Sequence, residues 1–319
     1  MNRLAFTFAI MVAIFTAAFC NSARAATAAP ANRYVASEVP VERFEAGILA
    51  VERHGGGDSR GVALILVPGL SSGAWAWQDT VRRLKASHAI YVVTLPGFDG
   101  RPALAASAGP VLPKVRAALR QLIAERHLDQ PVIIGHSLGA TLAIGLAEEH
   151  PGLLRAVVAI DGLAVMPGTE NTPPAMRAQM AAALKARMGH PDGVSFAEGQ
   201  QQYMRTVGVT DGVMADQLAQ LSARSDAHAV IDIMAEVLEQ DLRAMLPKIN
   251  VPLLLVAPYY QPDAVQRGLS EEMVKQYYAS LMAGTPVLTV VSIAPSRHFV
   301  MFDQPAALAR AIDAFIAPL

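Results

Sequence analysis

The chain has 319 residues, of which 53% are hydrophobic and 17% charged, and its formal net charge at pH 7 is −1. It contains a single cysteine and no C-x-x-C or H-E-x-x-H spacing, so the sequence predicts neither a disulfide framework nor a metal site. No basic cluster and no G-x-G-x-x-G motif is present, which argues against a nucleic-acid partner and a bound cofactor.

The first residues have the composition of a secretory signal peptide. A basic residue precedes an uninterrupted apolar or small stretch of sixteen residues, Leu4 to Phe19, and Ala23-Arg24-Ala25 places small residues where a signal peptidase reads. The stretch is shorter than the about 20 residues of a membrane span. Cys20 follows a phenylalanine instead of a small residue, so lipid attachment is the less favoured alternative. We expect cleavage after residue 25 and a periplasmic or secreted mature protein without a stable membrane anchor.

The mature chain alternates apolar runs with amphipathic spacings. Residues 26–43 are small, polar and proline-bearing and are expected to form a flexible lead-in, and Phe44 to Arg53 alternates like one half of an antiparallel hairpin. The apolar runs predict buried strands at 62–67, 89–94, 131–134, 156–160, 251–256 and 287–291. Helices are predicted between them, among others at 75–84, 111–123 and 305–316. We therefore predict an α/β fold in which residues 44–161 and 247–319 form a mostly parallel central sheet with helices on both faces.

The alternation stops between residues 162 and 246. This segment has helix-like stretches but no clear strand, and it contains eight of the thirteen methionines. Methionine recurs at adaptable binding surfaces, although it also fills ordinary helical cores. The segment follows a strand whose carboxyl end lies at the edge where ligands bind in open α/β sheets. We predict that residues 162–246 are an inserted helical cap.

Gly135-His136-Ser137-Leu138-Gly139 is a G-x-S-x-G run between a predicted strand and a predicted helix. Such a turn holds its serine in strained backbone geometry and exposes the hydroxyl, while the glycines avoid collisions with the strand and helix. The pattern indicates that Ser137 is a nucleophile. His136 is expected to point away from it and to serve in packing.

A serine nucleophile needs a base, because its own hydroxyl is a poor nucleophile at neutral pH. Ser296-Arg297-His298-Phe299 follows the last predicted strand and offers His298. Histidine is the residue type whose unperturbed imidazole titrates near neutrality. His298 is therefore the candidate base.

From about residue 62 to 316 the chain resembles the α/β-hydrolase family, specifically its capped esterase-like branch. Four places carry the resemblance: Pro68-Gly69-Leu70, Leu95-Pro96-Gly97-Phe98, Gly135 to Gly139, and His298 with Phe302-Asp303-Gln304-Pro305 behind it. The resemblance implies an α/β-hydrolase fold and a catalytic triad in the chain order serine, acid, histidine.

The resemblance also implies an oxyanion hole made by the backbone N–H groups of Leu70 and Leu138. Pro68 stands where relatives commonly have histidine, which bears on the rigidity of that loop. Trp75 and Trp77 are candidates either for the wall of the acyl pocket or for the core.

The triad acid has two candidates. Relatives usually carry it about nine residues beyond the proline that corresponds to Pro252, and that position is Gln261. Asp263 lies two residues later, where a short insertion brings it to the histidine. Asp161 ends the strand after the nucleophile helix, where some family members carry their acid and many keep a structural aspartate. We favour Asp263, with Asp161 as the competitor.

The resulting hypothesis is a secreted or periplasmic serine hydrolase that cleaves small-molecule carboxylic esters through an acyl-enzyme on Ser137. The alternatives are an acyltransferase or C–C bond hydrolase on the same fold, and a non-catalytic protein that binds a small apolar ligand.

Overall fold

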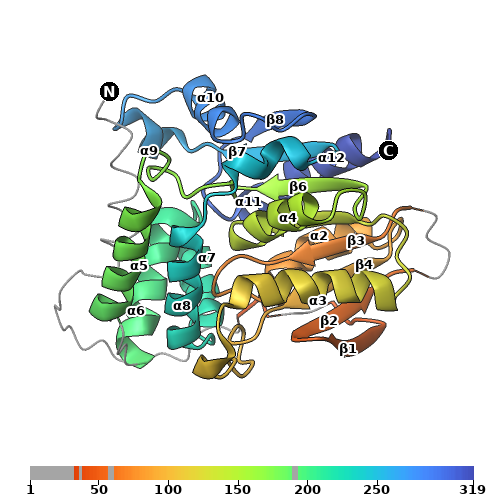
Figure 1. Ribbon diagram of the computed structural model, residues 1–319, viewed down its shortest axis with the longest axis horizontal. Helices are drawn as coiled ribbons and strands as arrows, with labels where there is room; N and C mark the ends of the chain where they lie inside the picture. The colour runs from red at the N-terminus through yellow and green to blue at the C-terminus, as the bar shows by residue number, and fades with distance from the viewer. Residues whose placement is uncertain (1–31, 36–37, 57–60, 189–192) are drawn as a thin grey trace.

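The computed structural model describes residues 32–35, 38–56, 61–188 and 193–319, and within them eight strands form one sheet (Figure 1). The sheet has the order β1-β2-β4-β3-β5-β6-β7-β8; the pairs β1–β2 and β2–β4 are antiparallel and the other pairs are parallel. The strands are β1 (Glu42–Ala46), β2 (Leu49–His54), β3 (Leu64–Val67), β4 (Ile90–Thr94), β5 (Val132–His136), β6 (Ala156–Ile160), β7 (Leu253–Pro258) and β8 (Leu288–Ile293). The predicted fold class is confirmed.

The N-terminal part differs in detail from the sequence expectation. Residues 44–53 contribute to both strands of a hairpin, because Gly47 adopts a φ of 57° and reverses the chain between β1 and β2. The described part of the lead-in is in contact with the domain: Asn32 donates to the Gln217 carbonyl at 2.6 Å, and the Glu38 carboxylate pairs with Lys85. The predicted signal peptide, residues 1–25, lies outside the described residues. No helix in the described ranges is long and apolar enough to cross a membrane.

Helices cover both faces of the sheet and bury its central strands on both sides, whereas the edge strands β1 and β8 are partly exposed. Alternate residues of β3 show the division, since Ile65 and Val67 belong to the core under α3 (Val111–Glu125) and α4 (Leu138–Glu149), whereas Leu64 and Leu66 belong to the opposite core. That opposite core is formed with α2 (Gln78–Leu84), α11 (Val300–Asp303) and α12 (Pro305–Ile316). A large aliphatic side chain contributes about 1.5–3 kcal/mol when fully buried. Burial on both faces explains why the strands are continuous apolar runs.

Trp75 and Trp77 are core residues. They lie in a 3₁₀ helix, Ala74–Trp77, and are only 1% and 0% exposed. The Trp75 ring stacks on Phe299 and Phe302 at centroid distances of 6.4 and 6.0 Å. Neither tryptophan lines the cavity described below, so the core alternative holds.

The segment between β6 and β7 is helical, and Figure 1 shows its helices α5 to α8 gathered beside the sheet. They are α5 (Pro174–Met188), α6 (Gly193–Tyr203), α7 (Gly212–Ser222) and α8 (Ala227–Glu239), with a π-helical turn at Met204–Gly208 and a 3₁₀ helix at Arg243–Lys248. Asp211 and Asp226 begin α7 and α8 as N-caps, since their carboxylates accept from Met214 N and Ala229 N at 2.7 and 2.8 Å. Two further helices, α9 (Gln261–Val265) and α10 (Glu271–Leu281), connect β7 to β8.

Candidate active site

Ser137 occupies a tight turn between β5 and α4. Its φ of 52° and ψ of −117° lie outside the regions that non-glycine residues ordinarily adopt. The turn is fixed because Ser137 N donates to the Ile160 carbonyl of β6 at 2.8 Å, and the Ser137 carbonyl accepts from Ala140 N at 2.9 Å. Strain of this kind persists only where surrounding contacts hold it, and it is common at functional sites.

The two glycines of the motif are required by close packing. A Cβ on Gly135 would lie 2.2 Å from the Gly139 carbonyl oxygen, and a Cβ on Gly139 would lie 2.1 Å from the Val67 carbonyl oxygen. Either side chain would force the strand, the turn and the helix apart. The glycines therefore allow the close approach that the sequence motif predicts.

The loop after β3 passes beside the serine. A Cβ on Gly69 would lie 3.2 Å from the Ser137 Cβ, so the following residue, Leu70, is close to the turn, and Leu138 directly follows the serine. The next residue, Ser71, has a φ of 58° and donates its hydroxyl to the Ser222 carbonyl at 2.9 Å. The Ser222 hydroxyl in turn donates to the Ser71 carbonyl at 3.1 Å, so two hydrogen bonds join this loop to α7.

His298 follows β8, and its partner is Asp161. The histidine Nδ1 lies 2.5 Å from Asp161 Oδ2, and the two side chains are only 10% and 13% exposed. Asp161 directly follows β6, has a φ of 46°, and donates its backbone N–H to the Val256 carbonyl of β7 at 3.0 Å. A proton on Nδ1 of His298 leaves Nε2 as an acceptor, as a general base requires.

The prediction that Asp263 reaches the histidine is wrong. Its two carboxylate oxygens accept from Nε and Nη2 of Arg297 at 2.8 and 2.9 Å, a bidentate pair. An arginine next to His298 competes for the nearest carboxylate, and its planar fork fits both oxygens at once. This arginine is the sequence signal that could have assigned Asp263 to a different partner.

The second oxygen of the Asp161 carboxylate is also engaged. Oδ1 accepts a hydrogen bond from the hydroxyl of Tyr278 on α10. Burial, followed by the Asp161 charge, raises the pKa of the Tyr278 phenol, so it stays protonated and remains a donor. Sequence reasoning did not single out Tyr278, because adjacent tyrosines on an amphipathic helix read as core residues.

His136 is fully buried and lies against the loop that carries His298. Its ring centroid is 4.5 Å from that of His298, and its Nε2 lies 3.0 Å from the His298 carbonyl oxygen. Burial, followed by the proximity of His298, lowers the pKa of His136 well below its ordinary value, so this imidazole is neutral. His136 is thus a packing residue as expected, and it packs on the loop that carries His298.

Ser137, Asp161 and His298 all line one cavity of about 300 Å³. Ser137 and His298 form no hydrogen bond in the described structure, and in unliganded enzymes such contacts often tighten only when substrate binds. The remaining wall comes mainly from the residues after β6, the β7–α10 connection and the helical segment, including Met166, Val207, Val237, Tyr259 and Tyr277. This wall is mostly apolar or aromatic, which suits a small apolar substrate group.

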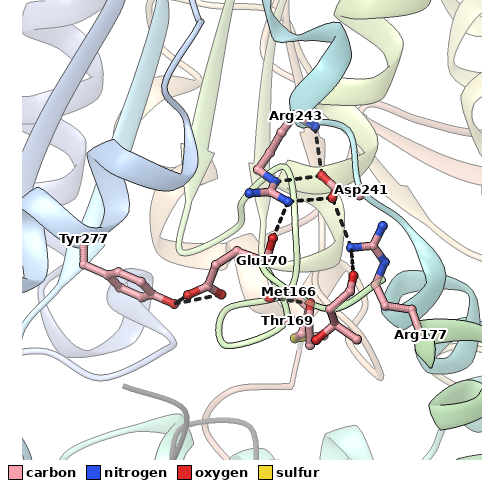
Figure 2. A network of polar contacts seen from close by, with 8 residues as sticks. Met166, Thr169, Glu170, Arg177, Asp241, Arg243 and Tyr277 are labelled. Atoms are coloured by element: carbon pink, nitrogen blue, oxygen red, sulfur yellow. Dashed lines mark hydrogen bonds and ion pairs between the residues drawn. The ribbon is translucent and has the colours of Figure 1, made fainter. Parts of the chain in front are cut away.

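One side of the cavity wall is fixed by a polar network between α10 and the helical segment (Figure 2). The Tyr277 hydroxyl accepts from Gly168 N at 3.1 Å and lies 3.3 Å from Glu170 Oε1. Burial, then the Glu170 charge, raises the pKa of Tyr277 to about 12. Arg243 donates to the Glu170 carbonyl and pairs with Asp241, which also accepts from Arg177 of α5 at 3.0 Å. The network holds α10 in place against the loop after β6.

Metal-ligating side chains do not cluster in the described part of the chain. The candidate site contains a strained serine turn, a histidine–aspartate pair and an adjoining cavity.

Comparison with known proteins identifies the family. The profile of the Alpha/beta hydrolase family matches residues 64–311. The biotin biosynthesis bifunctional protein BioHC of Cellvibrio japonicus is 27% identical over 263 residues, which cover 80% of this chain and 48% of that protein. A pimeloyl-[acyl-carrier protein] methyl ester esterase of Neisseria meningitidis serogroup A is 26% identical, with 60% of this chain and 59% of the relative covered. The chain thus spans about half to three fifths of the length of these relatives.

Solved structures show the same fold at low sequence identity. A thermophilic esterase from Thermogutta terrifontis matches with a TM-score of 0.69 and 16% identity, covering 87% of this chain and 98% of the other. MenH from S. aureus matches with a TM-score of 0.69 and 13% identity, covering 84% and 98%.

Proposed function

The chain belongs to the alpha/beta hydrolase family, and on this premise we propose that it is a serine hydrolase that cleaves carboxylic esters through an acyl-enzyme on Ser137. The observation that carries the proposal is that the strained serine turn and the His298–Asp161 pair line one cavity. Relatives named as methyl ester esterases support an ester as the substrate class.

The first half-reaction forms the acyl-enzyme. His298 Nε2 takes the proton of the Ser137 hydroxyl while the serine oxygen attacks the ester carbonyl carbon, and the carbonyl oxygen becomes an oxyanion. The backbone N–H groups of Leu70 and Leu138 stabilise that oxyanion; one such donor is worth about 2.7–4 kcal/mol. His298 then gives its proton to the departing alcohol. Asp161 keeps the proton on Nδ1 of the imidazole and stabilises the imidazolium that forms.

The second half-reaction repeats the sequence with water. His298 removes a proton from a water molecule, the water oxygen attacks the acyl carbon, and the collapse of the second tetrahedral intermediate returns the proton to Ser137. The products are a carboxylic acid and the free enzyme. The 300 Å³ cavity and the helices beside it favour small to medium esters, with the 162–246 segment acting as a cap.

Labelling with a fluorophosphonate tests the proposal. The wild-type protein should be labelled and should hydrolyse p-nitrophenyl butyrate, and Ser137→Ala should abolish both, because only an activated serine attacks the phosphorus. Ser296→Ala is the matched control: Ser296 lines the same cavity, but its hydroxyl donates to the Ile293 carbonyl at 2.8 Å. Equal labelling of wild type and Ser137→Ala would refute the assignment. A folded wild type without labelling or turnover would favour a ligand-binding protein.

We also propose that the protein is exported, with residues 1–25 as its signal peptide. The apolar stretch and the small residues at 23 and 25 support this proposal.

A further inference from the structure

The Asp161 carboxylate is divided between two partners on different elements. Oδ2 faces His298 Nδ1 from the loop after β8, and Oδ1 accepts from the Tyr278 hydroxyl on α10. The Asp161 side chain is 13% exposed, so little solvent reaches either oxygen. A carboxylate with both oxygens engaged in this way has one orientation available, which a single hydrogen bond would not impose.

The tyrosine before Tyr278 on α10 makes different contacts. This residue, Tyr277, belongs to the network of Figure 2, in which Gly168 N and the Glu170 carboxylate engage the Tyr277 hydroxyl. The two adjacent tyrosines of α10 therefore contact different groups. Tyr277 contacts the segment after β6, and Tyr278 contacts Asp161, the first residue of that segment.

We propose that Tyr278 is a positioning residue of the catalytic triad, which holds Asp161 Oδ1 so that Oδ2 faces His298 and thereby sets the pH at which His298 becomes an active base. This inference rests on the proposed function and deepens it.

The second part of the proposal follows from electrostatics. A hydrogen bond from the phenol draws negative charge toward Oδ1 and so weakens the stabilisation that the carboxylate gives to a protonated His298. Without that donor, the imidazolium is held more strongly, and His298 stays protonated to a higher pH. A stronger donor has the opposite effect.

Other titratable or charged side chains surround the Asp161–His298 pair, and each is either neutral or paired elsewhere. Tyr203 lies edge-on to His298 at 6.1 Å, and its pKa is raised by burial and by the Asp161 charge, so it is neutral. His136, at 4.5 Å, is also neutral. Arg297 adjoins His298 in the chain, but its guanidinium is paired with Asp263. Removal of the Tyr278 hydroxyl changes none of these groups directly.

The test compares Tyr278→Phe with Tyr277→Phe, a matched loss of one hydroxyl from the next residue of α10. For each protein, kcat, KM and the pH dependence of kcat/KM are measured with p-nitrophenyl butyrate from about pH 5 to about pH 9, together with the thermal midpoint. Tyr278→Phe should lower kcat by about tenfold to a hundredfold, as expected for a hydrogen bond to a charged group, with KM near wild type. The acid limb of its kcat/KM profile, where activity rises with pH as His298 loses its proton, should move to higher pH. Tyr277→Phe should leave the acid limb in place.

Two further measurements keep the test decisive if Tyr278→Phe folds poorly or esters prove to be no substrates. Replacement of Tyr278 by 3-fluorotyrosine keeps the ring and makes the phenol a stronger donor, so the acid limb should move to lower pH. In the protein without substrate, the far-downfield NMR resonance of the His298 Nδ1 proton should shift in both Tyr278 variants and remain in place in Tyr277→Phe.

The outcomes separate the two proposals. An active wild type that loses turnover in Ser137→Ala, but whose acid limb and Nδ1 proton are the same in the Tyr278 and Tyr277 variants, would overturn the role of Tyr278 and leave the serine mechanism standing. Turnover that survives Ser137→Ala would overturn the mechanism, and the Nδ1 resonance would still decide whether Tyr278 positions Asp161.

Discussion

Replacing Asp161 by asparagine removes the negative charge beside His298 and leaves the size of the side chain almost unchanged. The Tyr278 hydroxyl donates to Oδ1, so the amide oxygen is favoured at that position. The amide NH₂ then faces His298 Nδ1, which lies 2.5 Å from Oδ2 in the wild type. Nδ1 must become an acceptor, the ring proton moves to Nε2, and the imidazole can no longer take the proton of Ser137.

The expected cost is large. The same substitution in a serine protease lowers kcat by about 10⁴, chiefly through the wrong tautomer. At 1.36 kcal/mol for each factor of ten, this is about 5.5 kcal/mol of transition-state stabilisation. The pair in this chain is short and its side chains are 10% and 13% exposed, so solvent offers little replacement for the lost charge. We expect a loss of about 10⁴ in kcat with KM near wild type.

Asp263→Asn is the matched control, because it makes the same change in the carboxylate that sequence reasoning favoured. The Arg297–Asp263 pair is 17% and 37% exposed, and a partly exposed pair contributes about 1 kcal/mol or less to stability. Its kcat should fall by no more than about tenfold. Steady-state kinetics and thermal midpoints of both variants decide whether Asp161 or Asp263 is the acid that partners His298. If Asp263→Asn abolished turnover and Asp161→Asn did not, the assignment of the acid from this structure would be refuted.

Two further predictions concern stability and export. Burial, followed by the neighbouring Glu149 charge, raises the pKa of Glu148 from 4.5 to about 7. The folded protein therefore binds the Glu148 proton more tightly than the unfolded chain does. The free energy of unfolding consequently falls as the pH rises from about 4.5 through about 7. Glu148→Gln removes this loss, and its gain in thermal midpoint over wild type should be larger at about pH 8 than at about pH 5; an equal gain at both would contradict the prediction. The exported protein should begin at or near Ala26 without lipid, which intact-mass measurement checks, and an acylated Cys20 would show that the cleavage signal was misread.

The strained serine turn and the position of His298 could be predicted because their signals are local. The glycines around Ser137 and the strand before it specify the turn, and His298 stands directly after the last strand. The alternation of apolar runs and amphipathic helices likewise predicts the parallel sheet, because its central strands are buried on both faces.

The sequence offered both Asp161 and Asp263 as partners of the histidine but did not decide between them, because the choice depends on contacts that are distant in the chain. Asp161 and His298 are 137 residues apart, and Tyr278 reaches Asp161 across 117 residues. The choice between Asp161 and Asp263 is decided by the Arg297 guanidinium, which pairs with Asp263, and by the course of α10. Neither leaves a periodic pattern in the sequence.

The position of Asp161 also bears on how the cavity of this protein could be altered. Strands β5 and β6 pair in register, with His136 opposite Ile160, so the ladder of the sheet itself fixes the spacing of the residues that follow, Ser137 and Asp161. The chain from Tyr259 to Leu269 lines the cavity but supplies no partner to the histidine, and its Asp263 only pairs with Arg297. Part of the cavity wall is thus encoded in a stretch of sequence that holds none of the proposed reacting groups. If the chain cleaves esters as proposed, a library of substitutions over this stretch that spares Asp263 should change which ester fits while Ser137, Asp161 and His298 keep their geometry.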